Sequence, residues 1–253
     1  MNSLLELATD RCHLWITDPE TIEDPELLAA YGALLAPEEV VRHARFRFPQ
    51  HRQLFLVTRA LVRTTLSRYA PVAPAAWRFG QGEHGRPFIS APRDYRHLGF
   101  NISHTAGMIV CLVGRRTVGV DVEQWKRRTQ SMQLAERFFS PSEVADLESL
   151  TGLERQRRFF GYWTLKESYL KAVGKGLSMP LNRVTFTLTA GQPIRASLAG
   201  SGREYETSWQ FWQMPMGPDH LVAASLANDS EPELAIDRVH VVPLVEERFE
   251  TGR

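Results

Sequence analysis

The sequence predicts an α+β fold of two halves, in each of which helices lead into a small, mostly antiparallel sheet, and it leaves open whether the halves are an internal duplication. The main observation is an order of segments that occurs twice: helix-like stretches come first, and short runs of apolar and β-branched residues follow. A second observation is a weak similarity between the long helical stretches at residues 52–63 and 158–169. We place the boundary near residues 114–119 and divide the chain into residues 1–115 and 116–253.

The first half begins with an apolar strand at residues 14–16. A helix is expected from Pro37, because proline suits the first position of a helix. The next helix covers residues 50–69, where apolar side chains recur at helical spacing. Another face of this helix, which we expect to be solvated, carries three arginines: Arg52, Arg59 and Arg63. A turn-rich loop, GQGEHGRP at residues 80–87, separates the helices from the strands.

The turn at residues 114–116 fits a hairpin between the last two of three short β-like runs, which lie at residues 98–103, 108–113 and 118–122. In the second half, Ser140 and Glu143 have the spacing of a capping box at a helix start. A long helix is expected over residues 154–173, because Gly174 is typical of a helix end. Further strands are expected at residues 184–188, 209–211, 221–226 and 239–242.

Composition and charge limit the classes of function. The 253 residues are 43% hydrophobic and 23% charged, which is typical of a globular protein. The 30 Lys and Arg residues balance 29 Asp and Glu residues, so a broad nucleic-acid surface is not expected. Two cysteines, Cys12 and Cys111, are too few for a disulfide framework or a thiolate zinc site. We also expect no membrane segment and no targeting segment, and therefore a cytoplasmic protein.

Two carboxylates, Asp121 and Glu123, lie two residues apart in the run GVDVE. On a strand, side chains at this spacing point to the same side of the sheet. Two neighbouring carboxylates repel each other unless a cation lies between them, and a hard divalent ion suits oxygen ligands. The motif alone leaves two interpretations open, a metal site and an exposed strand face.

A second charged pair lies in the run WTLKESYLK, where Glu167 and Lys171 are spaced i and i+4 and share a helix face. In isolation, this spacing is typical of a solvent-exposed ion pair. The aromatic and aliphatic residues around the pair indicate a partly buried helix instead. Buried ion pairs are costly, so this setting favours a functional role.

Two further motifs present polar groups in turns. Ser103 and His104 end a strand in FNISHT, but a hydrolase triad also needs an orienting acid and an oxyanion site. Arg86 lies in the turn HGRP, where its guanidinium suits phosphate. The sequence contains neither a Walker A motif nor a dinucleotide-binding glycine motif.

In this order, the motifs HGRP, FNISHT, GVDVE and WTLKESYLKAVGKGL closely resemble those of the 4′-phosphopantetheinyl transferase family, of the broad surfactin-synthetase-activating type. The resemblance runs from about residue 37 to residue 181. It implies a pseudo-dimer of two α+β halves, with coenzyme A and Mg²⁺ in the cleft between them. It also implies transfer of 4′-phosphopantetheine from coenzyme A to a serine of an acyl, peptidyl or aryl carrier protein, with release of adenosine 3′,5′-bisphosphate. Such holo-carrier synthases serve fatty acid, polyketide or nonribosomal peptide synthesis.

The resemblance also implies a role for each candidate residue. Asp121, Glu123 and Glu167 are expected to bind Mg²⁺, and Glu167, or a metal-bound water that it orients, to take the proton of the carrier serine. Lys166 and Lys171 are expected to offset charge on the phosphates or the leaving group. Contacts to coenzyme A are expected from residues of the first half: Arg42, Gly85, Arg86, Pro87, Ser103 and His104.

Three positions depart from the common pattern of the family. Arg42 and Arg86 occur where lysine is common, which keeps the charge. Glu39 occurs where some relatives have a basic residue, so its role is open, and the arginines at residues 52–63 are candidates for the missing contact.

Two other functions are compatible with the same residues. A metal-dependent phosphodiesterase or nuclease would also use three carboxylates and a lysine, but the near-zero net charge argues against a nuclease. A non-catalytic adaptor of the same fold would not need the full set of Asp121, Glu123, Glu167 and Lys171. Because two pseudo-symmetric halves can supply a whole site from one chain, we expect a monomer.

Overall fold

The computed structural model describes residues 3–127, 129–176, 179–198, 209–228 and 234–250. The first half contains a strand, three α-helices, a two-stranded hairpin and two more strands, in this order: β1 (Arg11–Thr17), α1 (Pro25–Ala33), α2 (Pro37–Ala44), α3 (Pro49–Leu66), β2 (Arg78–Gln81), β3 (Pro87–Ala91), β4 (Gly99–Thr105) and β5 (Met108–Gly114). The second half repeats the order: β6 (Val118–Gln124), α4 (Ser131–Phe138), α5 (Pro141–Glu148), α6 (Gly152–Val173), β7 (Val184–Thr187), β8 (Arg195–Leu198), β9 (Trp209–Met216) and β10 (His220–Ala227). The last strands are β11 (Ala235–Val242) and β12 (Glu246–Glu250).

The strands of the two halves also pair in the same way. In the first half, β5 lies between β1 and β4, and in the second half β10 lies between β6 and β9. All of these pairings are antiparallel. The prediction of an α+β fold with two similar halves is therefore confirmed, and the long helices α3 and α6 occupy corresponding positions in it.

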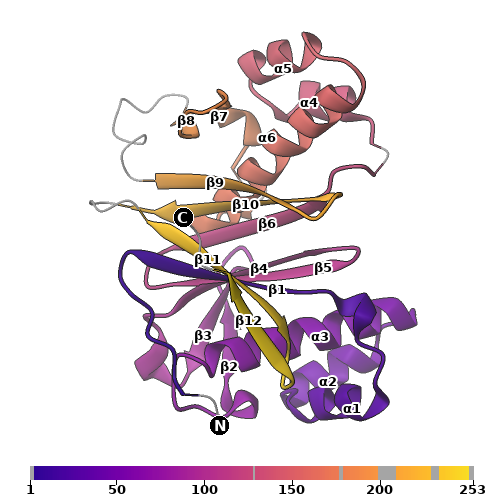
Figure 1. Ribbon diagram of the computed structural model, residues 1–253, viewed down its shortest axis with the longest axis vertical. Helices are drawn as coiled ribbons and strands as arrows, with labels where there is room; N and C mark the ends of the chain where they lie inside the picture. Colours follow the sequence, from indigo (N-terminus) through magenta and orange to yellow (C-terminus); the bar gives the residue numbers. More distant parts are fainter. Residues whose placement is uncertain (1–2, 128, 177–178, 199–208, 229–233, 251–253) are drawn as a thin grey trace.

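The two sheets pack face to face, and the helices of each half cover the outer face of its own sheet (Figure 1). The core between the sheets includes Leu14 and Leu112 from the first sheet and Val120 and Val122 from β6. Because successive residues of a strand point to opposite faces, the residues between and after these valines face the other way, towards α6. This alternation places two carboxylates, Asp121 and Glu123, on the side of β6 that faces α6.

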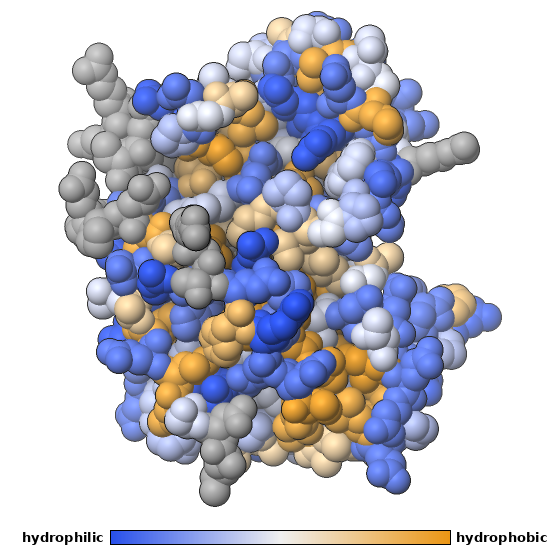
Figure 2. Space-filling view, viewed as in Figure 1, coloured by the Kyte–Doolittle hydropathy of each residue, from blue (hydrophilic) through white to orange (hydrophobic). Residues whose placement is uncertain are grey.

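The last two strands complete the first sheet, whose order is β12-β11-β1-β5-β4, with β11 parallel to β1. Residues 235–250 therefore pair with the first sheet, and the division into residues 1–115 and 116–253 stays a prediction. Hydrophobic side chains gather on the surface around the turn between β11 and β12, and smaller hydrophobic patches lie among hydrophilic side chains on the rest of this face (Figure 2). No helix in the described part of the chain is long and apolar enough to cross a membrane.

Two local predictions are wrong. Residues 114–117 do not form a hairpin turn, because β5 and β6 belong to different sheets and this segment connects them. The arginine face of α3 is exposed at Arg52 but not along its whole length. Arg63 is completely buried and pairs with Glu39 of α2 at 2.6 Å, while Arg59 lies 3.5 Å from the same carboxylate. Helical spacing identified the shared face but not the helix packed against it. Arg63, fully buried and bound by Glu39, is therefore excluded as a candidate for the missing contact to coenzyme A.

Candidate active site

Three polar side chains from three elements meet at the junction of the two halves. The Lys171 ammonium on α6 donates to Asp121 Oδ1 on β6 at 2.7 Å and to Ser103 Oγ on β4 at 2.8 Å. Ser103 Oγ also donates to Asp121 Oδ1, at 2.8 Å. Asp121 is only 5% exposed, so the lysine neutralises a carboxylate that water barely reaches. We call these three residues the Asp121 cluster.

Close backbone packing fixes the position of the Asp121 cluster. The backbone N–H of Val120 donates to Asn101 Oδ1 at 2.9 Å, which ties β6 to β4. A Cβ atom at Gly119 would lie 2.0 Å from the Ser168 carbonyl oxygen, so α6 lies directly on the backbone of β6. The sequence prediction gave Asn101 no role. An asparagine between apolar residues of a strand motif indicates a buried amide, and a buried amide needs a hydrogen-bond partner such as the Val120 N–H.

Glu123 and Glu167 lie beside the Asp121 cluster. Burial and the negative charge of Asp121 raise the pKa of Glu167, and the positive charge of Lys171 opposes this. Burial and Asp121 also raise the pKa of Glu123, which forms an ion pair with Arg127 at 3.1 Å. The structure therefore brings the three predicted metal ligands close enough to repel one another.

The donor atoms of these carboxylates fit a hard cation. Asp121 Oδ2 is buried and has no hydrogen-bond partner among the described residues, which is costly for a carboxylate oxygen. Carboxylate oxygens are the ligands that Mg²⁺ prefers. In the part of the chain that the structure describes, no three His, Cys, Asp or Glu side chains are already arranged around a metal position. The residues thus suit Mg²⁺, and binding it requires their side chains to adjust.

His104 follows Ser103 at the end of β4, near the surface. Desolvation lowers the pKa of His104, and the neighbouring Lys171 ammonium lowers it further, while Asp121 opposes the shift. The imidazole is therefore neutral at pH 7, with one nitrogen that donates and one that accepts a hydrogen bond.

The HGRP turn lies against the end of α6. Gly85 has a φ of 82°, which glycine adopts readily, and Pro87 begins β3. The Arg86 guanidinium donates to the carbonyl oxygens of Ala172 and Val118, and burial lowers the pKa of Arg86. Arg86 thus connects the first half to the end of α6 and the start of β6.

Arg42 lies apart from this group. It is on α2, and its guanidinium lies 5.4 Å from the centre of the Phe55 ring of α3. Among the described residues, no hydrogen bond or ion pair joins Arg42 to the Asp121 cluster or to Arg86, and its contact with coenzyme A stays a prediction.

Lys166 requires a correction. Its side chain is 0% exposed, and its ammonium pairs with Glu143 at 2.7 Å and donates to the carbonyl oxygens of Leu181 and Val184. Burial lowers the pKa of Lys166, and Glu143 opposes this. Because the ammonium is fully buried and bound by these three partners, it cannot reach a phosphate as the sequence prediction proposed. Adjacent positions on a helix point about 100° apart, so Lys166 and Glu167 face different neighbours.

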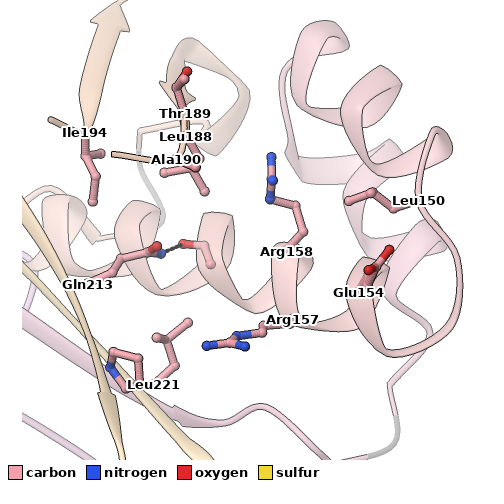
Figure 3. Close-up of a pocket in the computed structure, with 12 residues that line it drawn as sticks. Leu150, Glu154, Arg157, Arg158, Leu188, Thr189, Ala190, Ile194, Gln213 and Leu221 are labelled. Carbon is pink, nitrogen blue, oxygen red and sulfur yellow. Dashed lines mark hydrogen bonds between the residues drawn. The ribbon is translucent and has the colours of Figure 1, made fainter. Parts of the chain in front are cut away.

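A separate pocket of 560 Å³ lies against the first turns of α6, and Figure 3 shows Arg157, Arg158 and Leu188 around it. The α6 residues that line it, Glu154, Arg157, Arg158 and Gly161, come from the first three turns of the helix, whereas Glu167 and Lys171 lie in its last two turns. This pocket is therefore distinct from the Asp121 cluster.

Comparison with known proteins covers both halves. Residues 117–225 match the family model described as the 4′-phosphopantetheinyl transferase superfamily, and residues 23–117 match that described as 4′-phosphopantetheinyl transferase, N-terminal. The 4′-phosphopantetheinyl transferase HetI of Nostoc sp. is 35% identical over 222 residues, which cover 87% of this chain and 89% of HetI. The 4′-phosphopantetheinyl transferase Sfp of Bacillus subtilis is 31% identical over 171 residues, which cover 68% and 74% of the two chains.

A solved holo-(acyl-carrier-protein) synthase from Bacillus anthracis covers 45% of this chain and 96% of its own, at 18% identity and a TM-score of 0.37.

Proposed function

This chain belongs to the 4′-phosphopantetheinyl transferase family, and we propose that it transfers 4′-phosphopantetheine from coenzyme A to a serine hydroxyl of an apo carrier protein. The observation that carries the proposal at the site is the meeting of Ser103, Asp121 and Lys171 beside two further carboxylates, at the junction of the halves. Residues from the FNISHT, GVDVE and WTLKESYLK motifs, which are far apart in the sequence, thus form one group.

The reaction exchanges one oxygen–phosphorus bond for another. The serine oxygen of the carrier bonds to the phosphorus that bears pantetheine, and the bond from that phosphorus to adenosine 3′,5′-bisphosphate breaks. The serine loses its proton, and the bisphosphate leaves with the electron pair of the broken bond. Catalysis of this class of reaction depends mainly on positioning and on offsetting charge.

Asp121, Glu123 and Glu167 would hold Mg²⁺. Held by these carboxylates, Mg²⁺ would supply Lewis-acid stabilisation of the negative charge on the phosphates of coenzyme A. The unpartnered Asp121 Oδ2 and the mutual repulsion of the carboxylates support this assignment.

Glu167 would accept the proton of the carrier serine. Its raised pKa supports this role, because a base is most effective when its pKa lies near the working pH. Lys171 would place its positive charge beside the phosphates. Asp121 and Ser103 already orient its ammonium, which limits the entropy lost on binding.

Contacts to the phosphates of coenzyme A would come from the first half. His104 would donate to a phosphate oxygen, and Ser103 would do so by turning its hydroxyl proton away from Asp121. Arg86 and Arg42 would bind the 3′-phosphate and neighbouring groups. The turn residues Gly85 and Pro87 would lie beside the nucleotide. Arg86 uses some of its five N–H donors on Ala172 and Val118, so others are left for a phosphate. A single chain would supply the complete site, which supports a monomer.

The test is incubation with coenzyme A, Mg²⁺ and an apo carrier protein, followed by intact mass measurement of the carrier. We expect a gain of one phosphopantetheine group, and no gain with a carrier whose acceptor serine is replaced by alanine. The Asp121→Asn variant is the matched control, because it keeps the shape of the side chain and removes its charge. Hydrolysis of coenzyme A without modification of the carrier would indicate a phosphodiesterase instead.

A further inference from the structure

Lys166 and Glu143 form a buried ion pair in which the donors are matched to acceptors. Glu143 Oε2 accepts from the Ser140 N–H at 2.8 Å and from Ser140 Oγ at 2.9 Å, and Glu143 Oε1 accepts from the Phe186 N–H at 2.8 Å. The Lys166 ammonium contacts this carboxylate and the carbonyl oxygens of residues 181 and 184. One side chain thus ties α6 to the start of α5 and to β7.

The first half contains the same arrangement. Glu39 is the third residue of α2, as Glu143 is of α5, and it accepts the Ala36 N–H at 3.0 Å. Arg63 of α3 pairs with it at 2.6 Å and donates to the carbonyl oxygens of Pro74 and Trp77. In both halves, the cation on the long helix thus binds the first turn of the preceding helix and two carbonyl groups near the two-stranded hairpin.

The two pairs differ in the residues that follow them. Lys166 directly precedes Glu167, and Lys171 lies five residues later on the same helix. The corresponding positions after Arg63 are Thr64 and Arg68, and Arg68 pairs with Glu247 of β12 at 2.9 Å. Of the two ion pairs, only that of Lys166 and Glu143 therefore lies next to residues of the candidate active site.

We infer that Lys166 is a positioning residue. Its pairing with Glu143 sets the rotation of α6 about its own axis and its position along that axis, and thereby directs Glu167 and Lys171 towards Asp121. The inference rests on the proposed function for its effect on catalysis. A buried ion pair gives little net stability compared with apolar packing, but it accepts few geometries. An apolar helix face would tolerate a small shift of α6, whereas Lys166 must meet acceptors on three segments.

The experiment compares matched variants of the two ion pairs. Lys166→Met and Arg63→Met each remove one buried cation and leave its glutamate in place, and Lys166→Arg restores the charge with the side chain that the first half uses. Transfer to an apo carrier is measured per folded molecule, with the folded fraction taken from circular dichroism. A misplacement of about 1 Å costs on the order of 100-fold in rate. We therefore expect a loss of that order in kcat for Lys166→Met, near-wild-type kcat for Arg63→Met, and substantial recovery for Lys166→Arg.

A second readout does not depend on the reaction. The coupling between Lys171→Met and Asp121→Asn is measured by a double-mutant cycle of unfolding free energies, in the wild type and in each Met variant. We expect the coupling to disappear with Lys166→Met and to persist with Arg63→Met. Equal coupling in all three backgrounds, or equal kcat losses for the two Met variants, would overturn the inference. An inactive wild type whose coupling still depends on Lys166 would overturn only the proposed function. If Lys166→Met does not fold, Glu143→Gln, which keeps the shape of the carboxylate, is put through the same cycle.

Discussion

At the scale of single residues, the site carries an electrostatic cost in the absence of ligands. Glu167 and Glu123 are partly buried next to Asp121, and their pKa values are raised by burial first and by Asp121 second. Lys171 offsets the charge of Asp121 directly, and only partly that of Glu167. The ionised site is therefore less stable than its separate groups in water, and a divalent cation would relieve this cost.

Glu167→Gln should stabilise the metal-free protein at pH 7. A carboxyl whose pKa is raised in the folded state binds more protons when folded than when unfolded, so stability falls as pH rises from the ordinary glutamate pKa of 4.5 through the raised value. The glutamine side chain does not ionise, so the variant does not lose stability in this way. Unfolding by urea in the presence of a chelator, from pH 4 to pH 8, measures the difference. A variant that is less stable than the wild type at pH 7 would show that attraction to Lys171 outweighs the repulsion. Carrier modification should fall by orders of magnitude in the same variant.

Arg86→Ala should weaken the binding of coenzyme A more than that of dephospho-coenzyme A. The guanidinium lies where the first half meets α6, and its proposed partner is the 3′-phosphate that only coenzyme A carries. A charged hydrogen bond contributes about 1.5–3 kcal/mol, or roughly 10- to 100-fold in affinity. Calorimetry with the two ligands checks this. Equal losses for both would mean that Arg86 acts through its contacts with Ala172 and Val118 alone.

At the scale of elements, the site depends on how closely α6 approaches β6. Gly119 permits this approach, since a Cβ atom there would lie 2.0 Å from the Ser168 carbonyl oxygen and 2.6 Å from the Ala172 backbone nitrogen. Both contacts are with backbone, which cannot move away as a flexible side chain can. The glycine of the GVDVE motif is thus required by packing, two residues before Asp121.

Gly119→Ala should separate α6 from β6 and weaken the contact between Lys171 and Asp121. We expect a stability loss typical of core overpacking, about 1–3 kcal/mol, together with loss of carrier modification. Gly32→Ala is the control, because Gly32 lies inside α1 and a Cβ atom there meets nothing within 4 Å. It should stabilise the protein by about 0.5–1 kcal/mol. Thermal unfolding measures both variants, and a neutral Gly119→Ala would contradict the packing argument.

At the scale of the whole molecule, the site is divided between the halves. Ser103, His104 and Arg86 come from the first half, whereas Asp121 and Lys171 come from the second. The core between the sheets holds the two together. Only a molecule with both halves docked can therefore offer every group to a ligand.

Coenzyme A with Mg²⁺ should raise the melting temperature of the chain. Binding to the folded state alone stabilises it by about 2.7 kcal/mol at a ligand concentration 100 times Kd, and 1 kcal/mol corresponds to roughly 2–4 °C for a domain of this size. Differential scanning calorimetry with coenzyme A, with Mg²⁺ and with both separates the contributions. The part that depends on Mg²⁺ should be lost in Glu167→Gln. A shift by coenzyme A that is the same with and without Mg²⁺ would contradict a metal site at the carboxylates.

The sequence by itself determined the order of most elements, and it predicted the residues of the candidate site. The capping box of Ser140 and Glu143, the helix end at Gly174 and the alternation that puts Asp121 and Glu123 on one face all depend on neighbouring residues. Local rules are sufficient for such features, because backbone geometry fixes which nearby side chains share a face.

The tertiary structure decided which charged groups meet. Lys166 and Glu167 are neighbours in the sequence, yet Lys166 pairs with Glu143 of α5, whereas Glu167 lies beside Asp121 of β6. Likewise, Arg63 shares a helix face with Arg52 and Arg59, but it is buried because α2 and the segment at residues 74–77 cover it. Burial and ion pairing depend on segments distant in the chain, and helical spacing carries no information about them. For this reason, the sequence predicted Asp121 and Lys171 as separate candidates, and only the packing of α6 on β6 joined them through one carboxylate oxygen.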